Sequence, residues 1–216
     1  VAIVMLVLLI VPITIFVLIL LIVVAAWQVL RVRHQRANIS LLGRHLADLN
    51  LERHMETLTQ GYTRAIHEEN ESRQLQVLET FAPTERAVAA QMQTLATSIQ
   101  KDDAQRTRMG TYPICVPYAT HLLPASTQRD FRTLLQVHAN GLRRAVDNEA
   151  GWPPKTRAFH LSAELYLFQH SCHWFCKSRN VADARLMLRH QVTHKKVLES
   201  VSEPTRKAYL EWLRGR

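Results

Sequence analysis

The chain opens with an almost unbroken run of aliphatic residues, and the first charged side chain is Arg31. A helix over Val1–Leu30 would be about 45 Å long, against about 30 Å for the hydrocarbon core of a bilayer. A secretory signal peptide is the alternative, but its apolar region is shorter, about 7 to 15 residues, and a small-residue cleavage site follows it. The opening run of this chain is longer and is not followed by such a site. We therefore expect residues 1–30 to form one transmembrane anchor, whose excess length permits tilt. The polar or helix-breaking interruptions are Pro12, Thr14 and Gln28.

Basic residues follow the apolar run at once. By the positive-inside rule, this flank predicts a single-pass protein whose soluble domain lies on the cytoplasmic or matrix side. Arg31, Arg33 and Arg36 are candidate contacts for anionic lipid headgroups, each worth about 1 kcal/mol near the surface. The alternative interpretation is a plain stop-transfer flank.

Apolar residues recur at helical spacing from Ile39 to Leu78. The phase of this stripe slips between Leu49 and Met55, so the segment bends or packs on different partners along its length. Residues 31–82 are thus expected to hold the juxtamembrane flank and a long amphipathic helix.

Residues 83–216 are expected to form a helical domain. Pro83 starts a helix whose apolar side is Val88, Met92, Leu95 and Ile99. Residues 101–125 break the pattern with one glycine and three prolines, which predicts an irregular crossing. Its apolar side chains indicate that it packs onto something; they are Tyr112, Ile114, Val116, Tyr118, Leu122 and Leu123.

Further helices are expected after this crossing. Ser126 or Thr127 caps the first, which ends near Gly151 and Pro153; another closes near Asn180. A penultimate helix continues through Leu188, Val192 and Val197, and Ser202 begins a short last one. No strand-like alternation competes with these patterns. The predicted fold is all-α, with one transmembrane helix and a soluble domain of about five or six helices.

Length and charge narrow the class of protein. A chain of 216 residues allows one anchor and one domain large enough for its own core. The formal net charge of +9 favours anionic neighbours without choosing among them. Basic residues are not interleaved with aromatic ones, so nucleic acid is not an expected partner. Three cysteines are too few for a disulfide framework, and apolar packing must hold the core.

One constellation could bind a metal ion. Cys172 and Cys176 share one helix face, as do His190 and His194 in the next helix. A turn near Asn180 would allow the two pairs to meet, and a Cys2His2 set suits zinc. The competing interpretation is that these side chains are ordinary packing residues, because Cys172 also falls on an apolar stripe.

Other signals of catalysis or cofactor binding are absent from the sequence. Six glycines offer little material for a phosphate-binding loop, and there is no Cys-x-x-Cys-His haem motif. The sequence therefore favours a protein that is not an enzyme and has no cofactor, apart from the zinc hypothesis.

These observations predict a non-catalytic accessory or scaffold subunit, whose partners are other subunits of a membrane complex. The first residue is Val, and the net positive charge and the anchor are further features. A protein that is targeted to mitochondria by a cleaved segment would explain all three. That combination favours a respiratory-chain or ATP-synthase complex of the mitochondrial inner membrane. Two alternatives stay open: a bacterial inner-membrane secretion or conjugation scaffold, and a membrane-tethered zinc protein.

Overall fold

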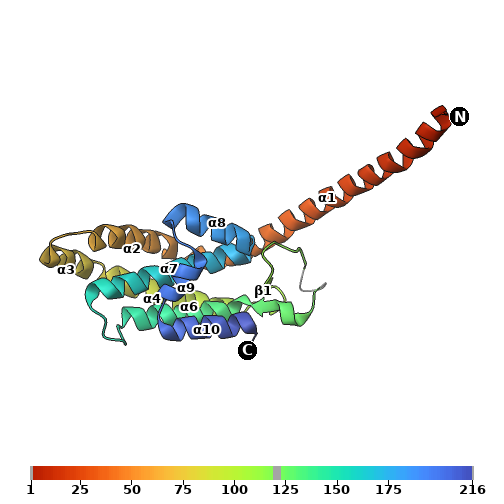
Figure 1. The fold of residues 1–216 in the computed structure, drawn as a ribbon. Coiled ribbons are helices and arrows are strands. Elements are labelled where there is room, and N and C mark those ends of the chain that lie inside the picture. Colours follow the sequence, from red (N-terminus) through yellow and green to blue (C-terminus); the bar gives the residue numbers. More distant parts are fainter. Residues whose placement is uncertain (1, 119–122, 216) are drawn as a thin grey trace.

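The computed structural model describes residues 2–118 and 123–215, with side chains described from residue 12 onward. A helical domain carries one long helix that projects far beyond it (Figure 1). This architecture confirms the expected all-α class. The helices of the described ranges are α1 (Ala2–Leu46), α2 (Leu51–Ile66), α3 (Glu71–Thr80), α4 (Ala82–Ile99), α6 (Phe131–Val146), α7 (Pro154–Cys176), α8 (Arg179–His190), α9 (His194–Ser200) and α10 (Glu203–Arg214), with a short 3-10 helix at Ala125–Thr127.

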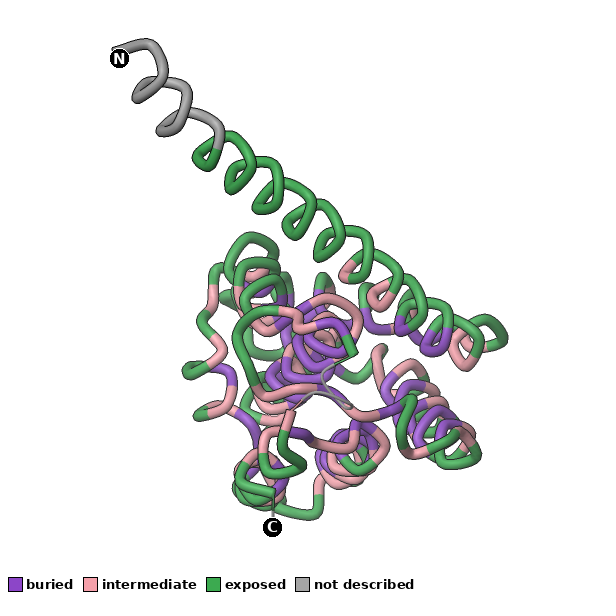
Figure 2. Tube along the Cα trace, turned by 90° about the vertical axis from the view of Figure 1, so that its right-hand side faces the viewer, coloured by how far each residue is buried: buried purple, intermediate pink, exposed green. Residues whose placement is uncertain are grey.

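Helix α1 combines two environments in one continuous element. Its described apolar side chains before Arg31 are exposed along their length, as Figure 2 shows for the projecting arm. This helix is long and apolar enough to cross a membrane. Its last turns instead belong to the domain, where Asn38, Leu41 and Leu42 are buried. Val1 and the side chains of residues 2–11 lie outside the described part of the expected anchor.

The prediction of one long amphipathic helix within residues 31–82 is wrong, because the end of α1, α2 and α3 share this segment. The chain turns at residues 47–50, where the phase of the apolar stripe slips, and turns again between α2 and α3. The second turn is closed by Gln74, whose side-chain amide donates to the carbonyl of Ala65 at 2.9 Å. Each segment can thus direct its own apolar face at the core.

The irregular crossing contains a small strand pair that the sequence did not predict. Strand β1 (Arg108–Gly110) pairs antiparallel with β2 (Gln128–Asp130), and Met109 lies opposite Arg129. Strands of three residues are too short to show an alternating pattern, so the prediction of no strand is wrong here. The pair brings together the two ends of the loop that residues 111–127 form.

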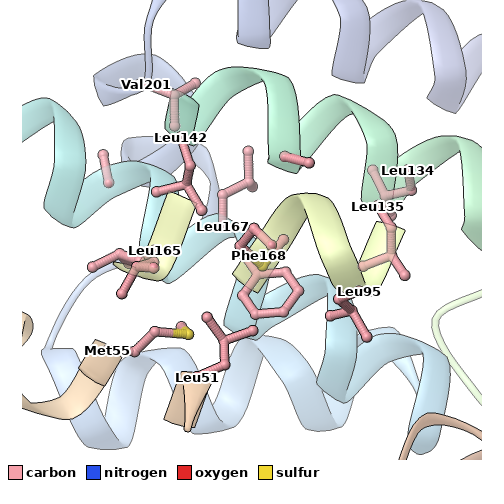
Figure 3. Packing of buried hydrophobic residues seen from close by; sticks show 14 of the residues in the cluster. Leu51, Met55, Leu95, Leu134, Leu135, Leu142, Leu165, Leu167, Phe168 and Val201 are labelled. Atoms are coloured by element: carbon pink, nitrogen blue, oxygen red, sulfur yellow. The ribbon is translucent and has the colours of Figure 1, made fainter. Parts of the chain in front are cut away.

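The core lies between α4, α6 and α7, as Figure 3 shows for part of it. Asp130 caps helix α6, because its side chain accepts from the N–H of Arg132 and satisfies a donor of the first turn. The next residue, Phe131, is fully buried and stacks on Phe175 at 4.2 Å between ring centroids. The apolar stripe predicted for α4 is confirmed as buried; it comprises Val88, Met92, Leu95 and Ile99.

The expected penultimate helix is two helices. Gln191 ends α8 in the left-handed conformation, with φ 53°, and Thr193 then caps α9 by accepting from the N–H of Lys196. Leu188, expected on the buried stripe, is 84% exposed. The break gives the two helices different faces toward the core: α8 contributes Ala182 and Leu186, and α9 contributes Val197.

Candidate functional site

Three side chains that can ligate metals meet where α7, α8 and α9 pack together. Helix α7 ends at Cys176, Ser178 caps α8, and the chain returns along α7 (Figure 1). This reversal brings Asp183 of α8 next to His170 of α7, and α9 then adds His194. Their candidate ligand atoms all lie within 4.8 Å of one another, which no other trio of His, Cys, Asp or Glu in the described ranges achieves.

The three side chains are already hydrogen bonded or stacked. His170 Nε2 lies 2.8 Å from Asp183 Oδ1, and the rings of His170 and His194 stack with their centroids 4.2 Å apart and 23° between planes. His194 Nε2 lies 3.1 Å from the hydroxyl of Tyr209. The cluster is therefore a connected polar network inside the helical domain.

Burial keeps the histidines of this cluster neutral. It lowers the pKa of His170, although the hydrogen bond to Asp183 opposes the shift, and it lowers the pKa of His194 to about 4. A neutral imidazole can ligate a metal. Two nearly parallel rings, however, direct their nitrogen lone pairs side by side and not at one point. Binding a metal ion here requires rotation of a ring.

The predicted zinc residues do not form one ligand set in the described structure. His194 joins His170 and Asp183, whereas His190 Nε2 pairs with Gln169 Oε1 at 3.0 Å and its ring stacks on Tyr166. Cys172 and Cys176 are free thiols, and burial raises the pKa of both, that of Cys176 to about 11. Zinc takes the thiolate form of cysteine, which this burial disfavours.

Cys172 and His190 instead line an open groove between α2 and the α7–α8 pair. Its volume is about 590 Å³, and its lining mixes apolar side chains such as Met55 with ionic ones. Glu56 and Arg189 approach to 4.0 Å from opposite sides of the groove, on α2 and α8. The predicted ligands thus face a wide cleft and not a closed coordination shell.

The candidate headgroup arginines lie where α1 enters the domain. Arg33 and Arg36 are exposed, and Arg31 is half-buried. The same turns of α1 contact the end of α7, since Gln35 Nε2 donates to the carbonyl of Lys177 at 3.3 Å. Two arginines are therefore free of cover by the domain, at the level where the apolar part of α1 ends.

A second buried polar network lies where α6, α7 and the start of α10 meet. Glu164 is fully buried, and its Oε1 accepts from the N–H and hydroxyl of Ser202 at 3.2 and 3.0 Å. Burial raises the pKa of Glu164 to about 7, although Thr205, Ser202 and Arg144 oppose the shift. Gly141 makes room for it, because a Cβ there would lie 2.7 Å from Glu164 Oε2.

Sequence reasoning missed His170 as a partner of His194, and it missed Asp183 and Glu164. His170 belongs to the same histidine- and cysteine-rich stretch as Cys172, so the sequence already marked it as a possible ligand. Its contact with His194 depends on the α8–α9 break at Gln191, for which the sequence carries no glycine or proline signal.

No protein-family model, curated protein or solved structure matches this chain.

Proposed function

We propose that this protein is a non-catalytic, single-pass accessory subunit that holds a helical domain in a fixed orientation at the surface of a membrane, within a larger membrane complex. The observation that carries the proposal is the continuity of α1. One helix contains both the exposed apolar arm and the buried turns at Asn38 and Leu42, with no loop between them.

Contacts on two sides hold α1 to the domain. The side chain of Asn38 donates to the carbonyl of Phe175 at the end of α7, at 2.9 Å. Further along, His45 pairs with Asp102, and its Nδ1 lies 3.0 Å from the hydroxyl of Ser98 at the end of α4. Because these contacts lie on different helices, the domain cannot pivot about α1 without breaking one set. Such a rigid junction suits a subunit that positions partners.

The basic flank supports placing the domain on the matrix or cytoplasmic side, with Arg33 and Arg36 at anionic headgroups. Within this class we propose the mitochondrial inner membrane, and a bacterial inner membrane as the alternative. Fractionation of the tagged chain from its native cells, with protease protection of a C-terminal tag, distinguishes these placements.

A pair of proline variants tests the rigid junction. Ala37 is an exposed residue inside α1, whereas Ala47 is exposed just beyond its end. Proline inside a helix costs about 3 kcal/mol and kinks it. We expect Ala37→Pro to remain integral in the membrane but to lose the subunits that co-purify in mild detergent, whereas Ala47→Pro keeps them. A wild-type chain that migrates as a monomer without partners would contradict the proposal.

The trio His170, Asp183 and His194 favours one second candidate, a membrane-tethered metal protein. Two imidazoles and a carboxylate are a donor set that suits zinc or ferrous iron. Metal analysis of the purified chain tests it, together with His194→Ala as the variant and His67→Ala as a control on the exposed end of α2. Less than a tenth of an equivalent of metal in the wild type would remove this candidate.

A further inference from the structure

The loop formed by residues 111–118, here called the uncharged loop, lies beside the turns of α1 that follow its apolar arm. The ring of Tyr118 lies 5.7 Å from that of His34, and Ile114, Cys115 and His34 line one small cavity. Both the loop and the projecting arm belong to the same end of the domain in Figure 1.

The uncharged loop exposes large apolar side chains that nothing in the described structure covers. Tyr112, Ile114 and Tyr118 are 39%, 59% and 41% exposed, whereas Pro117 between them is buried. Exposed apolar clusters of this kind mark surfaces that bind proteins or membranes, and this one lies next to the apolar arm of α1.

Charge patterning points in the same direction. No Asp, Glu, Lys or Arg occurs from Met109 to Gln128, and only the opening anchor contains a longer uncharged stretch. Arg33 and Lys177 lie on the elements that flank the loop. An uncharged tip between basic side chains fits an anionic bilayer surface, where aromatic residues favour the headgroup layer.

The depth of the loop agrees with this placement. His34 lies four residues beyond Leu30, which is about 6 Å along a helix. The headgroup region on each side of the hydrocarbon core is about 5 to 8 Å thick. Tyr118, whose ring centroid lies 5.7 Å from that of His34, would therefore lie in or next to that layer.

The loop is held in place by backbone contacts. The carbonyl of Pro113 accepts from the N–H of Asn180 at the start of α8, at 3.0 Å. The indole of Trp174 donates to the carbonyl of Gly110 at 3.2 Å. The exposed side chains are thus presented by a positioned loop that follows directly on β1.

We propose that the uncharged loop is a second membrane contact, in which Tyr112, Ile114 and Tyr118 insert into the headgroup layer beside α1. This inference rests on the proposed function, since it requires that α1 spans the bilayer. Two contacts with the membrane, one through α1 and one through the loop, would fix both the height and the rotation of the domain.

Quenching of tryptophan fluorescence by brominated lipid tests the contact. The full chain, carrying Trp27→Phe to remove the tryptophan of the arm, is placed in nanodiscs of phosphatidylcholine and phosphatidylglycerol. Ile114→Trp adds a probe to the loop, and Phe159→Trp adds a matched probe at an exposed site near the start of α7, at the opposite end of the domain. We expect shallowly brominated lipid to remove about half of the added emission at residue 114 and almost none at residue 159.

The outcomes separate the two proposals. A chain that alkaline carbonate washes off liposomes would overturn the membrane span and the loop contact together. A chain that resists the wash, but whose probe at residue 114 is quenched no more than the probe at residue 159, would overturn the loop contact alone. Urea unfolding of each variant confirms that the added tryptophan leaves the fold intact.

Discussion

The projecting arm of α1 and the core face of α6 are both rich in leucine, yet their leucines have opposite environments. Leu18 on the arm is 58% exposed, whereas Leu134 on α6 is fully buried. The difference is visible in the sequence, because the arm is apolar on every side and α6 on one side only. A one-sided helix finds its apolar partner within the chain, whereas a helix that is apolar all round must be covered on every side, and nothing in the described part of this chain covers the arm.

The largest expected effect comes from removing one aromatic ring from each region. Phe131→Ala deletes a buried ring that stacks on Phe175, and should lower the free energy of unfolding by about 3 to 5 kcal/mol. Phe16→Ala, on the exposed arm, should leave it unchanged. Urea titration in detergent, followed by tryptophan fluorescence, measures both. Equal losses for the two variants would mean that the arm belongs to the protein core.

A charge placed on each kind of exposed leucine should act differently. Leu18→Arg lies in the middle of the arm, where an arginine in lipid costs about 2.5 to 3.5 kcal/mol. It should reduce the fraction of the chain that resists carbonate extraction. Leu188→Arg changes an even more exposed leucine on α8 and should alter neither extraction nor stability. If the two variants resisted carbonate extraction equally, the arm would not be surrounded by lipid.

A buried acid makes the core, but not the arm, sensitive to pH. The pKa of Glu164, about 7 when folded and ordinarily near 4.5, means that the folded chain holds a proton which the unfolded chain releases. Its protonation stabilises the fold fully below pH 4.5, and that contribution is lost as the pH rises through 7.

Glu164→Gln should therefore be more stable than the wild type at pH 8, by about 3 kcal/mol at about 1.36 kcal/mol per pKa unit. At pH 4.5 the wild type and Glu164→Gln should have the same stability. Both contain the buried histidines, so subtracting one stability from the other removes the contribution of histidine titration. Urea midpoints at both pH values measure this difference. A constant difference would show that the pKa of Glu164 is the same in the folded and unfolded chains.

The smallest expected effect concerns the junction of the two regions. Asn38→Ala removes a buried hydrogen bond to the carbonyl of Phe175, which should cost about 1 kcal/mol. Ser40→Ala, on an exposed position two residues further, should cost almost nothing. Hydrogen exchange at the end of α7 measures the local change. No difference between these variants would indicate that the hydrogen bond of Asn38 does not contribute to holding α1 on the domain.

The predictable features were those set by residues close together in the chain. The stripe from Val88 to Ile99 is a repeating local pattern, so its burial followed from the sequence. The break between α8 and α9 was not predictable, in contrast to the turn at residues 47–50, which the phase slip of the apolar stripe had marked. Gln191 adopts a left-handed conformation that glycine or asparagine usually signals, so the α8–α9 break and the exposure of Leu188 were missed.

The candidate metal ligands failed to group as expected for the same reason. Spacing placed Cys172 and Cys176 on one helical face, but it could not say which side chains of α8 and α9 that face would meet. In the structure the break after His190 separates it from His194, which turns toward His170 and Asp183. Long-range contacts of this kind depend on how the helices pack, and the spacing of residues in the sequence does not specify that packing.

Helix α1 continues without interruption from the arm to Leu42, so a tilt of the arm is transmitted to the domain. A helix longer than the bilayer is thick leans over to keep its apolar residues in lipid, and it leans further in a thinner membrane. Because the domain is fixed to the end of that helix, the same angle is imposed on every surface it carries. Local bilayer thickness, together with the contacts that the protein makes at the membrane surface, would thereby influence the direction in which the domain faces its neighbours.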